Sequence, residues 1–350
     1  RYYVQTKLVN TVDAETLNNL VNTAPLIETG ADDFAWQYGT TRANPDSRHP
    51  YYSDGYEDGG PGFYMSNYMM WFMFSDKPVE DPRLRYYFYR QDCDETNEDD
   101  FTLDCAALPP PDHYPPGTPW CTASGPFSDP LDNYSGYWGR DHGNDDGIPP
   151  DDLKRSAWGQ YPAGGLFDAN QCEGVSNGGT DGLRGAGIQP ILLSSFVEFL
   201  RAEAVLTMGA SGDAAAFLEA GMRESMMKVR NFGALPAGVD PQLVPTDSIV
   251  DLYITTVLDE FNSADADGKM QVLAEEFYIA AHGWGLDIYN LYRRTGKPAG
   301  FQPVREPNPG PFPRTFWYPA SFVNRNSSVA QKTDLTTQVF WDTNPAGFIK

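Results

Sequence analysis

The second half of the chain carries the clearest helical periodicity. Apolar residues recur at three- and four-residue spacing over residues 268–294, which predicts one long amphipathic helix. Arg293 and Arg294 fall in its last turn, where positive charge stabilises the carboxyl end of a helix. Gly296 suits the left-handed position that follows many helices, and Pro298 prevents continuation. The sequence therefore predicts both the body and the end of this helix.

The same spacing predicts three helices before the long one. The first begins near Leu192 and stops at Gly209, and the second begins after Asp213, a residue type that caps helices. The third contains Tyr253 and Val257 on its apolar face. Because the links between these helices are short, we expect antiparallel pairs of the tetratricopeptide kind, although the chain has no clean internal repeat.

Residues 1–24 also show a helical pattern, in which Asp13 can cap a helix with Leu17, Leu20 and Val21 at helical spacing. The chain starts at Arg1 without an initiator Met, a signal peptide or a lipid-accepting Cys. We therefore expect the natural N-terminus to lie before Arg1.

The amino-acid composition is different between Pro25 and Gly187. This segment holds 21 of the 33 glycines and 17 of the 29 prolines, so its regular elements must be short and separated by turns. One helix is predicted inside it, around Tyr68 and Phe72. After Pro298 the chain is again rich in proline and is expected to run extended over the helices.

These patterns predict a mainly α protein with four parts in one compact unit. Residues 1–24 end an N-terminal helical region, residues 25–187 form a loop-rich irregular lobe, residues 188–297 form helix pairs, and residues 298–350 form an extended C-terminal strap. The length and the 41% hydrophobic content are sufficient for a sizeable core.

The net charge of the chain limits the kinds of molecule that it is expected to bind. The chain has 48 acidic and 25 basic residues and a formal net charge of −23. Such a surface repels nucleic acids and anionic lipids, so we expect neither as a partner. The most apolar run, residues 68–74, is far shorter than the roughly 20 residues that a membrane-spanning helix needs.

Four cysteines, Cys93, Cys105, Cys121 and Cys172, fall in the loop-rich lobe without the close spacing of zinc or redox motifs. An even number of cysteines in irregular segments favours disulfides in an oxidising compartment. Cys93 with Cys105 and Cys121 with Cys172 is one of the three possible pairings, and four buried thiols are the alternative.

Three blocks of sequence resemble the SusD/RagB nutrient-binding family. The first, residues 187–204, looks like the family's helix with a Phe-Leu-x-Ala-Glu-Ala run, and the second is the Arg-Arg-Thr-Gly-x-Pro pattern at 293–298. The third block comprises residues 314–319, 324–327 and 340–342. Together with Asp81-Pro82-Arg83 and Tyr161-Pro162, these blocks span nearly the whole chain in the family's order.

The resemblance implies a SusD-like fold, in which tetratricopeptide-like helix pairs support a large irregular lobe that carries the ligand face. It also implies a lipoprotein on the extracellular face of the outer membrane, with a SusC-like TonB-dependent transporter as partner. Family members begin with a signal peptide, a lipidated Cys and further helices. The membrane contact would therefore come only through an anchor that this sequence does not contain.

Aromatic residues in the lobe are candidates for glycan binding, because the apolar face of a sugar stacks on an aromatic ring. We expect two or three of them to be exposed and the others to build the core. Trp138 with Arg140 and Asp141, and Trp120, are the first choices, whereas Trp284, Trp317 and Trp341 are expected to be structural. The full set of aromatic candidates is Trp36, Tyr38, Tyr56, Trp120, Tyr137, Trp138 and Trp158.

One acidic loop raises the question of calcium. Asp141, Asn144, Asp145 and Asp146 cluster in one loop with Gly143 and Gly147, but their spacing does not fit the EF-hand template. A second partial match that ends at Glu276 lacks the required glycine. We expect no cofactor and solvated charge at both places, with Ca²⁺ near Asp141, Asp145 and Asp146 as the alternative.

Motifs of hydrolases, metalloproteases and nucleotide-binding enzymes are absent from the sequence. The histidines are scattered, and His282 is expected to pack within the long helix. The leading hypothesis is therefore a non-catalytic surface protein that captures a glycan or a peptide and delivers it to the transporter. A glycoside hydrolase with two carboxylates is one alternative. A transporter lid with little ligand affinity of its own is the other.

Overall fold

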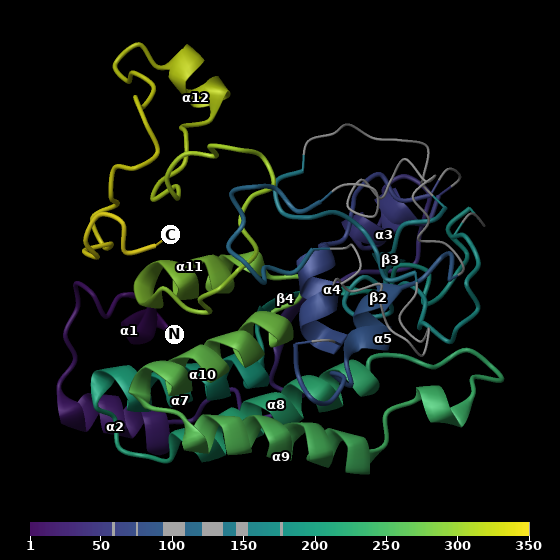
Figure 1. Ribbon diagram of the computed structural model, residues 1–350, viewed down its shortest axis with the longest axis horizontal. Coiled ribbons are helices and arrows are strands. Elements are labelled where there is room, and N and C mark those ends of the chain that lie inside the picture. Colours follow the sequence, from purple (N-terminus) through teal and green to yellow (C-terminus); the bar gives the residue numbers. More distant parts are fainter. Residues whose placement is uncertain are drawn as a thin grey trace.

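The computed structural model describes residues 1–57, 60–74, 76–93, 109–120, 136–144, 153–175 and 178–349. Five helices dominate the second half and confirm the mainly α prediction; four of them pack as a layer along one side of the molecule (Figure 1). None of the helices in these ranges combines the length and the apolar character that a bilayer crossing requires. The five are α7 (Ser194–Met208), α8 (Ala214–Arg230), α9 (Asp247–Ser263), α10 (Ala266–Ala280) and α11 (Gly285–Thr295).

The predicted helix boundaries are mostly correct because the capping residues act as expected. The Asp213 side chain accepts hydrogen bonds from Ala215 N and Ala216 N at the start of α8. At the carboxyl ends, Gly209 after α7 and Gly296 after α11 adopt left-handed backbone angles with φ of 74° and 69°.

The prediction of a single helix over residues 268–294 is wrong. The segment forms α10 and α11, which are separated by a turn in which Gly283 has φ of 90°. A side chain at Gly283 would also collide with Pro162, since an added Cβ would lie 2.6 Å from the proline ring. Apolar periodicity continues across the turn because both helices face the same core, so the pattern alone does not reveal the break.

The core of the helical half lies between α7, α8 and α10. The rings of Phe199 and Phe277 stack with centroids 5.3 Å apart, and Phe196 packs beside them. Gly221 on α8 permits this packing, because an added Cβ would lie 2.9 Å from the Phe199 ring. Two short helices at the N-terminus, α1 (Tyr2–Gln5) and α2 (Ala14–Asn22), add residues to the same core.

The lobe is built from short elements around a second core. Strand β1 (Phe34–Gln37) pairs antiparallel with β4 (Ile188–Leu192), and β2 (Phe88–Tyr89) pairs antiparallel with β3 (Ala157–Trp158). Three helices, α3 (Pro50–Gly55), α4 (Asn67–Phe74) and α5 (Leu84–Tyr87), lie beside these strands. A single-turn 3-10 helix, η1 (Pro241–Leu243), precedes α9.

Buried charges join the lobe to the helical half. The Arg83 guanidinium lies 2.6 Å from an Asp81 oxygen and 3.0 Å from a Glu276 oxygen. Lys77 also pairs with Glu276, and the Tyr253 hydroxyl donates to the same carboxylate at 2.8 Å. Because each charge has a partner, the lobe is fixed to α9 and α10 without an isolated buried ion.

The C-terminal segment, residues 298–349, contains one short helix, α12 (Ala320–Arg325). Arg314 forms a two-pronged pair with Asp342 at 2.6 and 2.8 Å, and Arg293 at the end of α11 donates to Arg314 O at 2.6 Å. These bonds attach the segment to α11, while α12 lies at the top left of the view and α3 at the upper right (Figure 1).

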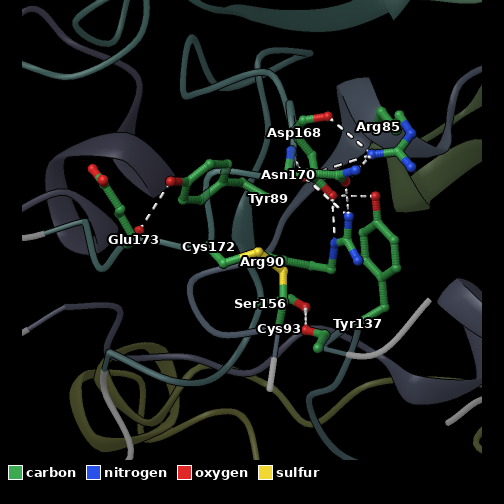
Figure 2. The surroundings of a disulfide bond; sticks show 11 residues. Arg85, Tyr89, Arg90, Cys93, Tyr137, Ser156, Asp168, Asn170, Cys172 and Glu173 are labelled. Carbon is green, nitrogen blue, oxygen red and sulfur yellow. Dashed lines mark hydrogen bonds and ion pairs between the residues drawn. A yellow bond between two sulfur atoms is a disulfide. The ribbon is translucent and has the colours of Figure 1, made fainter. Parts of the chain in front are cut away.

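A disulfide joins Cys93 to Cys172, so the pairing of Cys93 with Cys105 and of Cys121 with Cys172 is wrong. Figure 2 shows the bond beside Asp168, whose carboxylate accepts from Arg90 Nε at 2.8 Å and from the Tyr137 hydroxyl. Cys105 and Cys121 lie outside the described residues. Spacing misled the prediction because folding brings residues 79 positions apart into contact.

Candidate ligand-binding site

An aromatic column runs from the interior of the lobe to its surface. Tyr161 stacks on Tyr87 with centroids 5.6 Å apart, and Tyr87 stacks on His282 at 4.3 Å. His282 lies 4.7 Å from the Trp158 ring, and Trp158 stacks on Tyr51 at 4.4 Å with an interplanar angle of 7°. Tyr161 and Tyr87 are buried, whereas Tyr51 is 41% exposed. The column therefore ends in a ring that solvent reaches.

The outer end of the column is fixed by its local structure. Pro50 occupies the first turn of α3, and the His49 side chain accepts a hydrogen bond from Tyr51 N at 3.2 Å. The Tyr51 ring also contacts His49 and Phe63 at centroid distances of 5.2 and 6.0 Å. These contacts hold the ring against Trp158.

A cavity of about 290 Å³ lies beside the middle of the column, where the lobe meets the helical half. Trp158 from β3, Tyr64 and Ser66 before α4, and Tyr278 and His282 at the end of α10 contribute to its wall. The described residues that line it include no Asp, Glu, Lys or Arg. Its volume is at the lower end of the range for small-molecule pockets.

Two polar side chains of this wall lack a partner within the described part of the chain. The Nε2 atom of His282 is buried and makes no hydrogen bond, although the residue as a whole is half-buried. The Tyr278 hydroxyl likewise has no hydrogen bond to the described residues. Burial lowers the pKa of His282 to about 3 and raises the pKa of Tyr278 to about 12, so both groups are neutral at pH 7.

The other polar group of the cavity wall, the Ser66 hydroxyl, already has hydrogen-bond partners within the protein. Ser66 Oγ lies 3.1 Å from His142 Nε2, and His142 Nδ1 lies 3.1 Å from Gln302 O. Ser66 Oγ also accepts from Met69 N at 3.2 Å, so it caps α4. We infer that Ser66 supports the wall and leaves the directional contacts to His282 and Tyr278.

Four of the predicted binding residues are buried and offer no ring face to a ligand, namely Tyr56, Trp120, Tyr137 and Trp138. Their surroundings explain the difference. The Tyr56 hydroxyl donates to Trp158 O at 2.5 Å and accepts from Leu166 N at 2.9 Å, so this side chain holds two loops together. Tyr137 packs against the Arg90 guanidinium at 4.6 Å and bonds to Asp168. In a lobe with few backbone ladders, the core itself requires these rings.

Arg140 and Asp141 also have structural contacts. The Arg140 guanidinium lies 4.0 Å from the centroid of the Tyr64 ring, which places it behind one wall residue of the cavity. Asp141 is buried and accepts hydrogen bonds from Gln302 at 2.6 Å and Asn67 at 3.4 Å. Asp145 and Asp146 lie outside the described residues, and no group of three potential metal ligands occurs within the described ranges. The expectation of no cofactor, with calcium near Asp141, Asp145 and Asp146 as the alternative, stays a prediction.

Trp158 and Trp36 retain access to solvent. Trp158 is half-buried within the column, and Trp36 on β1 is 64% exposed. Trp36 pairs with Gln189 of β4, and the Gln189 amide donates to Gly283 O at 2.7 Å, next to His282. Because paired residues of two strands share a face, Trp36 lies on the side of the sheet that meets the cavity's turn.

The remaining aromatic residues singled out from the sequence are also partly half-buried and partly exposed. Tyr38 is half-buried against His49, with ring centroids 4.8 Å apart. Trp284 and Trp341 are half-buried, but Trp317 is exposed and so does not match the structural role that its sequence position suggests.

Sequence reasoning missed Tyr51, Tyr278 and His282. Tyr51 is one of two adjacent tyrosines after Pro50, and this local signal marks a helix start rather than a ligand contact. The sequence pattern places His282 within a helix, but the residue lies in the turn after α10 and its ring enters the column. Only the three-dimensional contact between segments separated by more than 100 residues identifies these side chains.

A larger cavity of about 580 Å³ lies between α1, α2 and α7. Its wall is mostly aliphatic, with Leu17, Val21 and Leu200 among its residues. The guanidinium of Arg201, one of its two charged residues, is already bound to Glu198 at 2.7 Å. It therefore offers little of the directional polar chemistry that a glycan requires.

Neither a protein-family model nor a curated protein sequence matches the chain. Solved structures of SusD homologues do match. A homologue from Bacteroides fragilis is 17% identical, with a TM-score of 0.56 over 93% of this chain and 59% of the other. A homologue from Bacteroides uniformis is 19% identical, with a TM-score of 0.53 over 93% of this chain and 58% of the other.

A third match is an outer membrane protein from Bacteroides vulgatus that has been linked to nutrient binding. It is 17% identical, with a TM-score of 0.53 over 93% of this chain and 60% of the other. The chain thus has the SusD-like fold that its sequence blocks indicate, and it spans about 60% of the length of these structures.

Proposed function

We propose that this chain, which has a SusD-like fold, is the ligand-capturing part of a non-catalytic nutrient-binding protein and that its ligand is a glycan. One observation carries the proposal: an aromatic column ends at the exposed Tyr51 ring, beside a cavity with unpaired neutral polar groups. A ring face of this kind stacks on the apolar side of a sugar, and hydroxyl groups satisfy the polar groups.

The same geometry favours binding over hydrolysis. A glycoside hydrolase places two carboxylates on either side of the scissile bond. The described residues that line the cavity contribute none, and Asp141 nearby is engaged by Gln302 and Asn67. A protein that binds its ligand and releases it unchanged therefore explains this geometry more simply than a hydrolase does.

The cellular setting belongs to the same proposal. The similarity in fold to SusD homologues, and to an outer membrane protein linked to nutrient binding, supports a location on the extracellular face of the outer membrane. A SusC-like TonB-dependent transporter would then receive the ligand. A lipid anchor outside residues 1–350 would hold the protein at the membrane.

Calorimetric titration of the purified chain tests the proposal. The panel contains maltohexaose, cellohexaose, xylohexaose and mannohexaose, together with mixed-sequence peptides, and each mixture is chromatographed afterwards. We expect at least one oligosaccharide to bind and to be recovered at its original length.

Recovery of shorter sugars would instead establish the hydrolase, and binding of peptides alone would replace the glycan. No binding to any member of the panel would contradict glycan capture. Tight association with the transporter in that case would identify a lid.

A further inference from the structure

We propose that the cavity beside the aromatic column recognises an uncharged sugar unit through His282 and Tyr278. This inference rests on the proposed glycan binding and specifies the chemistry of the same site. It concerns which glycans are accepted and which residues make the selection.

Polar atoms of His282 and Tyr278 lack hydrogen-bond partners among the residues that the structure describes. Buried polar groups in folded proteins nearly always have a hydrogen-bond partner, and leaving one without a partner costs about 1–3 kcal/mol. The buried Nε2 atom of His282 has none within the described residues, so this cost applies to it. The half-buried Tyr278 hydroxyl also makes no hydrogen bond to the described residues, but water can reach it. Both side chains line the cavity, so a bound molecule is in a position to supply a partner to the half-buried Tyr278 hydroxyl. The Nε2 atom of His282 is buried, so the ligand reaches it only if the wall around the ring shifts.

The chemistry of the two groups defines the molecule. A tyrosine hydroxyl donates and accepts, and a neutral imidazole has one donor and one acceptor nitrogen. A sugar hydroxyl also donates and accepts, so it fits either tautomer of His282. A carboxylate or sulfate only accepts and would bring a charge without a counter-charge into a partly buried site.

The charges around the cavity also favour an uncharged ligand. The described residues that line it carry no formal charge at pH 7, and the whole chain has a net charge of −23. Two arginines, Arg140 and Arg155, lie over the Tyr64 ring at 4.0 and 4.2 Å, but neither lines the cavity. Acidic sugars therefore lose hydration without gaining an ion pair.

The size of the cavity limits how much of a chain can enter. A volume of about 290 Å³ is small compared with pockets for drug-sized ligands. We infer that one sugar unit occupies the cavity, with the stacking on Tyr51 made by a neighbouring unit.

Titration of neutral and acidic oligosaccharides against the whole chain tests this selection. The neutral arm is the tightest-binding hexaose among the four neutral sugars, and the acidic arms are hexamers of galacturonate and of alginate. About 0.5 M NaCl screens surface charge to a length of roughly 4 Å, so a remaining preference reports on the site rather than on the net charge. We expect the neutral hexamer to bind at least about tenfold more tightly than the acidic ones.

Two variants identify the residues that select. Tyr278→Phe removes only the hydroxyl, and His282→Phe removes both nitrogens while keeping a ring in the column. Each is expected to weaken neutral-sugar binding about five- to tenfold, which corresponds to about 1–1.4 kcal/mol. Tyr318→Phe in the C-terminal segment is the matched control and should change binding by less than about twofold.

Several results would overturn the inference. Equal or tighter binding of an acidic hexamer would contradict the selection of uncharged sugar. Unchanged neutral binding in both variants, with their folding confirmed by circular dichroism, would contradict the role of His282 and Tyr278 and leave glycan capture intact. No binding of any sugar to the unmodified chain would remove the inference together with the proposed function.

Discussion

The helical half and the lobe use aromatic residues in different ways. In the helical half, Phe199 and Phe277 contact each other across two α-helices, in which hydrogen bonds within the helix pair most backbone groups. In the lobe, tyrosine hydroxyls bond to loop carbonyls, as Tyr52 does to Asp181 O at 2.6 Å and Tyr89 to Glu173 O at 2.9 Å. The rings of the lobe thus replace missing backbone ladders, and only those at its edge remain available to a ligand.

This difference explains why aromatic content is a poor guide to ligand contacts. A loop-rich lobe uses most of its tyrosines and tryptophans to hold segments together, because its backbone groups also need partners. The proposed binding surface lies where the two halves meet, since the helical half supplies His282 to the column that the lobe begins and Tyr278 to the wall of the adjacent cavity.

The largest effect is expected where the two halves are joined. Arg83→Met leaves the carboxylates of Asp81 and Glu276 buried with fewer partners, which should reduce the free energy of unfolding by about 3–5 kcal/mol. Urea unfolding followed by far-UV circular dichroism measures the loss. The control is Arg223→Met, which removes solvent-exposed pairs with Glu219 and Asp251 and should cost less than about 1 kcal/mol. Equal losses in the two variants would show that the junction does not hold the halves together.

The disulfide should matter more to the lobe than to the helices. Replacing both Cys93 and Cys172 by Ser removes a link between residues 79 positions apart, and this should cost about 2–4 kcal/mol. Tryptophan fluorescence, which reports largely on the lobe, should show a larger decrease of the urea midpoint than far-UV circular dichroism. Identical shifts by both probes would indicate that the two halves unfold as one unit.

Hydroxyl-to-backbone bonding in the lobe is tested by Tyr56→Phe. The substitution keeps the ring but leaves Trp158 O and Leu166 N without this partner, so we expect a loss of about 1–3 kcal/mol in the free energy of unfolding. Chemical denaturation of the variant beside the unmodified chain provides the measurement. A loss below about 0.5 kcal/mol would mean that the lobe does not depend on such bonds.

A pH-dependent effect is expected in the helical half. Burial alone raises the pKa of Glu203, but Arg294 and Lys7 lower it from 4.5 to about 2. The ion pairs therefore stabilise the folded state fully above about pH 4.5, and this contribution is lost as the pH falls toward about 2.

Acid titration of stability measures the contribution of Glu203. The slope of unfolding free energy against pH in that interval should be smaller in Glu203→Gln by up to about 1.4 kcal/mol per pH unit, the value for one proton. Unfolding curves recorded at pH values between about 2.5 and about 5 provide the slopes. Parallel slopes for the two proteins would contradict a depressed pKa in the folded state.

Helix positions in this chain could be predicted well because they depend on local signals. Asp13, Asp213, Gly209 and Gly296 act as the caps that their residue types suggest. The break at Gly283 could not be predicted, because apolar spacing continues through it and the cause is a contact with Pro162, more than 100 residues earlier.

The candidate site was only partly predictable. Trp158 and Trp36 are among the aromatic candidates that the sequence suggests, and both stay accessible, but Tyr51 and His282 join Trp158 only after separate segments fold together. Trp138 and Tyr137 are aromatic residues in a similar glycine-rich segment, but they lie in the core. Whether such a ring is buried depends on neighbours that are distant in sequence.

Ligand binding at the outer end of the aromatic column is the central claim, and one titration tests it most directly. Isothermal calorimetry would compare the unmodified chain, Tyr51→Ala and Tyr318→Ala with the tightest-binding neutral hexaose. Tyr51 and Tyr318 are similarly exposed, at 41% and 39%, but Tyr51 belongs to α3 in the lobe and Tyr318 precedes α12 in the C-terminal segment. We predict that Tyr51→Ala weakens binding at least about tenfold, or about 1.4 kcal/mol, and that Tyr318→Ala leaves it unchanged. Equal affinity in all three proteins would contradict the assignment of this site.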